Sequence, residues 1–101
     1  MIKIIKYPEF KTQIQNQPVQ LVDVRNEMEF ELGNIPGSIL INVQSSNFED
    51  LVKEKLNFKE PIYLYCRAGV RSQLAAKILE NLGATEIIDL EGGYLSWIQN
   101  N

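Results

Sequence analysis

Histidine is absent from this sequence of 101 residues. Its absence excludes the usual zinc sites, Ser-His-Asp and Cys-His catalysis, and any general base that depends on an imidazole ring. Chemistry in this chain must therefore use a carboxylate, a hydroxyl, a lysine or a thiol, and we expect no metal and no cofactor.

Cysteine is nearly absent as well. Cys66 is the only one, so no disulfide can form within the chain. It is a buried core residue, a thiol nucleophile or an intermolecular partner. The N-terminal stretch MIKIIKYPEF lacks the long apolar run of a signal peptide or membrane span, so we expect a cytoplasmic protein whose thiol stays reduced.

The sequence also lacks an excess of positive charge. Its formal net charge is −3, and no basic amphipathic face is evident, which argues against nucleic acid or a membrane as a partner. With 45% hydrophobic and 23% charged residues, the composition is that of an ordinary globular protein. The length fits a single domain covering residues 1–101.

Short apolar runs alternate with helical patterns along the chain. The apolar runs predict strands at 2–5, 19–24, 37–42, 61–66 and 85–90. Helices are expected at 7–16, 26–32, 46–56, 72–82 and in a short C-terminal segment with Trp97. Capping-box patterns begin the second and third of these helices at Asn26 and Ser46. This order predicts an α/β fold: a five-stranded, mostly parallel sheet flanked by helices on both faces.

Cys66 lies in the stretch YLYCRAGVRS, between an apolar strand and a helix. Ligands of open α/β sheets bind outside the carboxyl ends of strands, where loops lead into helices. Gly69 permits a tight turn whose N–H groups point inward, and a helix N-terminus adds positive potential. Helix N-termini and nearby cations lower the pKa of cysteine thiols from about 8.5, so this loop suits a reactive thiolate.

The three arginines all lie at this predicted edge of the sheet. Arg25 follows the second strand, Arg67 and Arg71 flank the turn, and the seven lysines lie elsewhere. Each feature alone has an ordinary explanation, because lone cysteines are commonly buried and loop arginines are commonly solvated. Their coincidence within six residues favours an anion site with a reactive thiol over an inert core cysteine.

Three separate segments of the chain resemble the single-domain rhodaneses, a family of sulfurtransferases. LVDVRNEMEFELGNIPGSILIN resembles the first signature of the family, YLYCRAGVRS its active-site loop, and LEGGYLSW its C-terminal signature. Asn34 is one departure, because the family often has histidine there. We expect that change to be neutral for activity.

The resemblance implies a role for each matching residue. Cys66 corresponds to the catalytic cysteine, which accepts a sulfane sulfur and becomes a persulfide. The substrate-binding loop corresponds to Arg67, Ala68, Gly69, Val70 and Arg71, with Arg67 and Arg71 orienting an anionic donor. Supporting positions are Asp23, Arg25 and Ser72, of which Asp23 and Arg25 are expected mainly to brace the loop from below. Gly92, Gly93 and Trp97 match structural positions.

Loop length distinguishes two reactions within this fold. Cys66 through Arg71 span six residues, as in sulfurtransferases, whereas related phosphatases and arsenate reductases have one more. We therefore expect a sulfurtransferase that moves sulfur from thiosulfate, a polysulfide or a persulfide to cyanide, a thiol or a protein cysteine. A non-catalytic binding or redox-sensing module is the main alternative, and a phosphatase or arsenate reductase is the next.

Overall fold

Five parallel strands form a single sheet in the order β1-β5-β4-β2-β3. The strands are β1 (Ile2–Ile5), β2 (Gln20–Asp23), β3 (Ile39–Leu40), β4 (Ile62–Tyr65) and β5 (Ile87–Leu90). This computed structural model describes residues 1–101 and confirms the predicted α/β fold. The central strand β4 lies between β5 and β2, so the residue that follows it emerges at the middle of the sheet edge.

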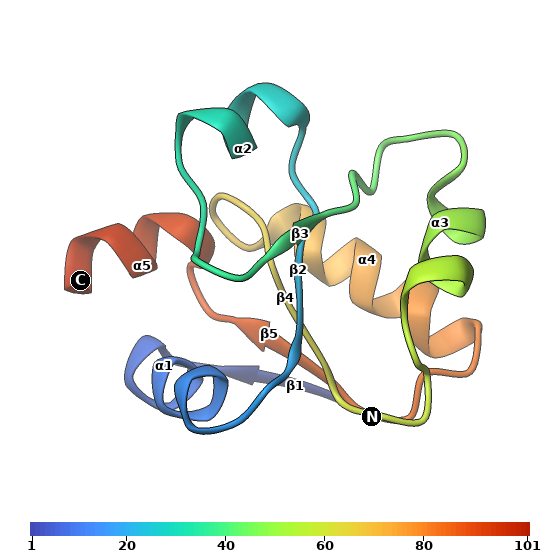
Figure 1. Cartoon of the computed structure of the whole chain (residues 1–101), viewed down its shortest axis with the longest axis horizontal. Helices are drawn as coiled ribbons and strands as arrows, with labels where there is room; N and C mark the ends of the chain where they lie inside the picture. The colour runs from blue at the N-terminus through green and yellow to red at the C-terminus, as the bar shows by residue number, and fades with distance from the viewer.

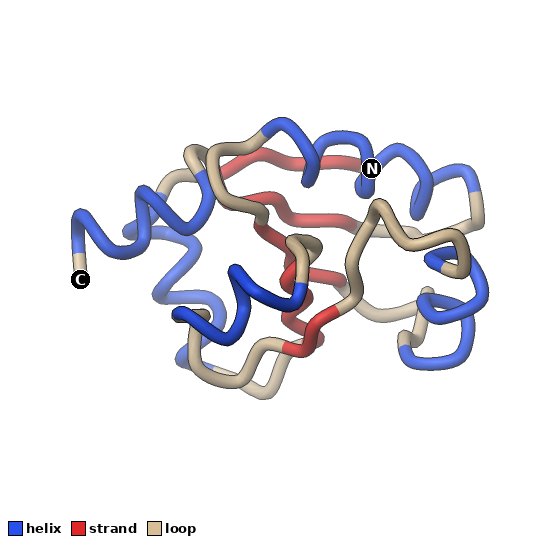
Figure 2. The backbone as a smooth tube through the Cα atoms, turned by 90° about the horizontal axis from the view of Figure 1, so that it is seen from above, coloured by secondary structure: helices blue, strands red, loops and turns tan.

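Helices cover both faces of the sheet. They are α1 (Tyr7–Asn16), α2 (Glu27–Leu32), α3 (Phe48–Lys55), α4 (Val70–Asn81) and α5 (Gly93–Asn100). Figure 1 shows α1 and α5 on one side of the sheet and α3 and α4 on the other, and Figure 2 shows the strands between these two layers. Helix α2 projects beyond the carboxyl end of β2 (Figure 1). None of the helices has the length and apolar character needed to cross a membrane.

The two faces of the sheet bury different kinds of side chain. Successive strand residues point to opposite faces. Ile62, Leu64 and Cys66 therefore join an aliphatic cluster beneath α3 and α4. Tyr63 and Tyr65 join an aromatic-rich cluster beneath α1 and α5, which includes Trp97. The Trp97 ring is buried and meets Tyr7 edge-on at a centroid distance of 5.5 Å, as expected of an anchor for the last helix.

Most of the predicted elements are confirmed, but four details differ. The third strand pairs with β2 over only Ile39 and Leu40, because Gly37 (φ 88°) and the turn at Asn42 bend the chain on either side. The capping box expected at Ser46 is wrong: α3 begins after Asn47, whose side chain bonds to the Ser45 hydroxyl and caps no helical N–H.

The other two differences concern α4. This helix begins at Val70 rather than Ser72, because Gly69 in the left-handed region (φ 112°) forms its N-cap. Ser72 therefore lies inside the first turn of α4, where its side chain points toward the sheet and is buried. Leu74 was expected on the apolar face of the helix but is 56% exposed.

Candidate active site

The loop after β4 turns its backbone around the sulfur atom of Cys66. Gly69 takes a φ of 112°, which a residue with a Cβ rarely adopts, and its N–H donates to Cys66 Sγ over 3.0 Å. The thiol lies 3.4 Å from Ser72 Oγ, and the Ser72 hydroxyl donates to the Gly69 carbonyl at 3.2 Å. Cys66 is only 1% exposed, so the sulfur lies at the floor of the loop rather than on its surface.

The N-terminus of α5 supports this loop from the outside. Tyr94 N–H donates to the Cys66 carbonyl at 2.8 Å, and Leu95 N–H donates to the Arg67 carbonyl at 3.1 Å. These bonds satisfy N–H groups that a helix start otherwise leaves without partners. A Cβ on Gly93 would collide with the carbonyl oxygens of Cys66 and Arg67. The glycine pair of the C-terminal signature thus allows α5 to approach the loop closely.

Arg71 forms a two-point ion pair with Glu29 of α2. Its Nη1 and Nη2 donate to the two carboxylate oxygens at 2.7 and 2.9 Å. The hydrogen bond to Arg71 is the largest cause that lowers the Glu29 pKa to about 2. Glu29 also completes the capping box of α2 with Asn26, as predicted. Two of the Arg71 nitrogen atoms are therefore occupied by Glu29. The role of Arg71 in orienting an anionic sulfur donor stays a prediction.

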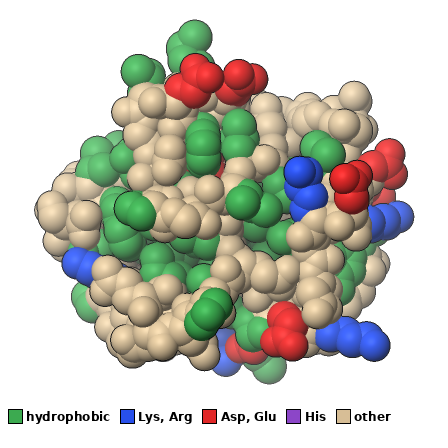
Figure 3. All heavy atoms as spheres, in the orientation of Figure 1, with side chains coloured by type: hydrophobic (Ala, Val, Ile, Leu, Met, Phe, Trp, Pro, Cys, Tyr) green, Lys and Arg blue, Asp and Glu red, His purple; other side chains and the backbone are tan.

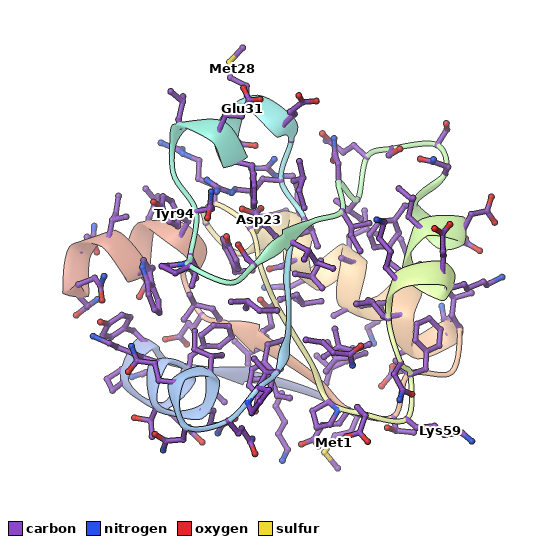
Figure 4. All side chains as sticks on the ribbon, viewed as in Figure 1. Met1, Asp23, Met28, Glu31, Lys59 and Tyr94 are labelled. Atoms are coloured by element: carbon purple, nitrogen blue, oxygen red, sulfur yellow. The ribbon has the colours of Figure 1, made fainter.

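Arg25 and Asp23 form a buried pair at the end of β2. Arg25 Nε donates to both Asp23 oxygens at 3.0 Å, and Nη2 donates to Oδ2 at 2.7 Å. The same Nη2 donates to the Gly33 carbonyl after α2, and the guanidinium lies 4.5 Å from the centre of the Tyr94 ring. Figure 4 labels Asp23 and Tyr94, which lie below α2. This arrangement ties the end of α2 to α5, and the expected bracing of the Cys66–Arg71 loop by this pair stays a prediction.

Arg67 differs from the other two arginines because it is exposed and has no ion-pair partner. It lines a shallow hollow of about 240 Å³ between α2 and α5. Apolar side chains share this hollow, including Leu32 and Ile98, which are 85% and 50% exposed. Figure 3 shows apolar side chains projecting beside acidic ones at the α2 end of the molecule. The hollow offers one free cation next to an apolar rim.

The structure thus gathers every predicted site residue at the carboxyl edge of the sheet, although only the Gly69 N–H and the Ser72 hydroxyl bond directly to the sulfur. It adds two acidic residues that sequence reasoning missed. Glu29 lies 42 positions from Arg71, and no local pattern signals that contact. Asp89 is a buried carboxylate in β5. The sequence did indicate its burial, because it is an acid within an apolar strand that is covered on both faces.

The chain belongs to the rhodanese-like domain family, whose family profile matches residues 7–100. The loop, the buried arginine–aspartate pair and the closely packed glycine pair all lie within the matched residues.

Relatives of this chain are named for several different activities. It is 37% identical to the uncharacterized protein YqhL of Bacillus subtilis, covering 96% of this chain and 73% of YqhL. It is 36% identical to a tRNA uridine(34) hydroxylase of Picosynechococcus and 35% identical to the adenylyltransferase and sulfurtransferase UBA4 of Meyerozyma guilliermondii. These matches cover 85% and 83% of this chain but only 30% and 21% of the longer relatives.

Solved structures with the same fold include whole chains of similar length. A rhodanese-like domain protein of Staphylococcus aureus superposes with a TM-score of 0.83 at 34% identity, covering 94% of this chain and 90% of that one. The human single-domain sulfurtransferase TSTD1 superposes with a TM-score of 0.81 at 26% identity, covering 97% and 96%. Homologues of this chain are thus sulfurtransferases in some proteins and parts of hydroxylases in others.

Proposed function

We propose that this chain is a sulfurtransferase that carries a sulfane sulfur on Cys66 as a persulfide. One observation carries the proposal: the sole thiol receives a backbone N–H bond from Gly69 inside a six-residue loop at the N-terminus of α4. Such a site stabilises a thiolate and, after reaction, a terminal persulfide anion.

The proposed reaction has two steps. The Cys66 thiolate attacks the outer sulfur of thiosulfate, the S–S bond breaks, and sulfite leaves with the bonding electron pair. The new Cys66 persulfide then gives its terminal sulfur to a second nucleophile, which regenerates the thiolate. Cyanide yields thiocyanate in an assay, and a thiol or protein cysteine yields a new persulfide.

Both substrates are proposed to come from outside the chain. Arg67 suits an anionic donor, because its guanidinium is exposed and unpaired beside the loop. The acceptor must be external, since no second cysteine can resolve the persulfide. The apolar rim that includes Leu32 and Ile98 favours a protein cysteine as the acceptor over a small ion alone.

Mass spectrometry after incubation with thiosulfate tests the proposal. The wild type is expected to gain the mass of one sulfur atom, and cyanide is expected to remove it with release of thiocyanate. Cys66→Ser, which retains a hydroxyl of similar size, is the matched control and is expected to gain nothing. A wild type that stays unmodified with thiosulfate, polysulfide and glutathione persulfide contradicts the proposal.

Burial of the sulfur favours a second candidate, a redox-sensing or binding module without turnover. A thiol that is 1% exposed offers little surface to a substrate. The two candidates differ in turnover: with donor and cyanide in excess, a transferase forms thiocyanate in repeated cycles, whereas a module without turnover forms about one equivalent at most.

A further inference from the structure

Asp89 is a buried carboxylate with no ion-pair partner. It is 1% exposed, and its Oδ1 has no hydrogen-bond partner. An unpaired polar group in the core is costly, and most such groups in folded proteins are satisfied. Burial raises the Asp89 pKa to about 6, and a hydrogen bond with the Ser72 side chain acts in the opposite direction. The molecule thus keeps a proton-binding group in the core without a cation to pair with its charge.

The register of the sheet places Asp89 on the same face as Cys66. Asp89 pairs with Leu64 of β4, and Cys66 lies two residues beyond Leu64 on the same face. Ser72, in the first turn of α4, is buried and points toward this face. Its Oγ lies 3.4 Å from Cys66 Sγ, and its hydroxyl is also the one side-chain group that lowers the Asp89 pKa. The Ser72 hydroxyl therefore acts on both the sulfur and the carboxyl group.

We propose that Asp89 is a positioning residue that accepts the proton of the Cys66 thiol through the Ser72 hydroxyl. The Cys66 S–H proton passes to Ser72 Oγ, and the Ser72 proton turns from the Gly69 carbonyl and passes to Asp89. The products are a thiolate, an unchanged hydroxyl and a neutral carboxylic acid. One negative charge is kept throughout, but it moves from the closed core to the loop, where the Gly69 N–H holds it.

Arg71 interacts electrostatically with Cys66, but a guanidinium cannot accept the thiol proton. On the elements around β5, Lys3 pairs with Glu86, Arg71 pairs with Glu29, and the N-terminal amine pairs with Glu80. Lys77 is exposed on the outer side of α4. The tyrosines of β4 and α5 lie in the aromatic cluster on the opposite face; they are Tyr63, Tyr65 and Tyr94. The proposed exchange therefore involves only Cys66, Ser72 and Asp89.

The pH dependence of thiol alkylation tests this inference. It rests on Cys66 acting as a nucleophile but needs no sulfur donor, so it can be read whether or not the chain transfers sulfur. The alkylation rate of the single cysteine by iodoacetamide is measured by mass spectrometry from about pH 4.5 to about pH 9.5. For the wild type we expect two rises, the first near pH 6, separated by a plateau.

Asp89→Asn keeps the shape of the side chain and removes its proton exchange. We expect its profile to lose the lower rise and to follow a single titration, as for a lone thiol. Ser72→Ala is expected to lower the plateau by about threefold or more, because the bridging hydroxyl is gone. Equal numbers of rises in wild type and Asp89→Asn overturn the proposal, and an unchanged plateau in Ser72→Ala overturns the part assigned to Ser72.

A second measurement keeps the inference testable if Asp89→Asn does not fold. The carboxyl carbon of Asp89 is followed by NMR against pH in the wild type and in Cys66→Ala. Coupling predicts two steps in the wild type and one step in the variant. Identical titration curves contradict it.

Discussion

The two aspartates in the core lie on opposite faces of the sheet and have opposite surroundings. Asp23 is 0% exposed and accepts bonds from the Arg25 guanidinium and from the Arg25 backbone N–H. Asp89 is 1% exposed, yet no cation pairs with it and one of its oxygens has no partner. The two carboxylates are thus equally buried, but they differ in whether their oxygens accept hydrogen bonds and in whether a cation pairs with them.

This difference distinguishes a carboxylate that holds elements of the fold together from one that is left available for proton exchange. The Asp23–Arg25 pair also bonds to the loop after α2 and packs on Tyr94, so its contacts join three elements. Asp89 makes no ion pair and lies on the same face of the sheet as the thiol. A buried acid with a raised pKa and an unpartnered oxygen near a thiol is the pattern expected of a functional group.

Removal of Arg25 should have the largest effect on stability. Arg25→Ala leaves Asp23 as an uncompensated buried charge, and breaking such a pair typically destabilises a protein by about 3–5 kcal/mol. Urea unfolding at neutral pH measures the loss. The matched control is Asp23→Asn combined with Arg25→Met, which removes both charges and should regain much of the stability. A loss below about 1 kcal/mol for Arg25→Ala would mean that the pair is not structural.

Asp89→Asn should remove a pH dependence of about 3 kcal/mol. The raised pKa means that the folded state keeps a proton that the unfolded chain releases between its ordinary value, 3.8, and about 6. The wild type therefore loses stability as the pH rises through this window, and about 3 kcal/mol is the corresponding free energy. The stability of the variant minus that of the wild type should grow by this amount from about pH 2.5 to about pH 7.5, and by most of it from pH 4 to pH 7.

Taking this difference at each pH cancels the other titrating groups. Glu29 acts in the opposite direction: its lowered pKa stabilises the fold above its ordinary range and is lost in acid, equally in both proteins. A constant difference between the two curves would show that Asp89 is ionised in the folded state as in the unfolded one.

Local sequence patterns predicted much of this molecule. The apolar runs, the Asn26–Glu29 capping box and the glycine stops predict elements whose positions agree with the structure to within a few residues. The site loop was predictable because its parts are adjacent: one strand end, one glycine and one helix start hold the thiol.

Contacts between distant residues could not be predicted in this way. Glu29 serves as both a capping residue and the partner of Arg71, and only the ion pair between α2 and the first turn of α4 shows the second role. Asp89 was open to inference, because any polar residue in a strand covered on both faces must be buried. The sequence could not show that Ser72 acts on Asp89 and that no cation pairs with this carboxylate.

The approach of α5 to the loop can be tested at Gly93. Gly93→Ala adds a Cβ against the carbonyl oxygens of Cys66 and Arg67 in a backbone with φ of 59°. The control is Gly37→Ala, whose φ is 88° but whose Cβ meets nothing within 4 Å. We expect Gly93→Ala to lose about 2 kcal/mol more than Gly37→Ala, because only it adds a collision to the backbone strain. Equal losses would mean that α5 does not constrain the site.

The Arg71–Glu29 pair is an intermediate case between the two aspartates and should give the smallest effect. Its side chains are 25% and 22% exposed, so solvent screens the attraction that buried Asp23 receives in full. Glu29→Gln keeps a side chain that can complete the capping box and removes only the charge. We expect a loss of less than about 1 kcal/mol that shrinks further in high salt.

A double-mutant cycle with Arg71→Ala isolates the pair energy from the capping bonds. If the coupling exceeded the effect of breaking the Asp23–Arg25 pair, burial would not be what makes a charge pair structural in this fold. A small coupling leaves Arg71 free to exchange Glu29 for an anionic donor at little expense in stability. Such an exchange is what the proposed role of Arg71 in donor binding requires.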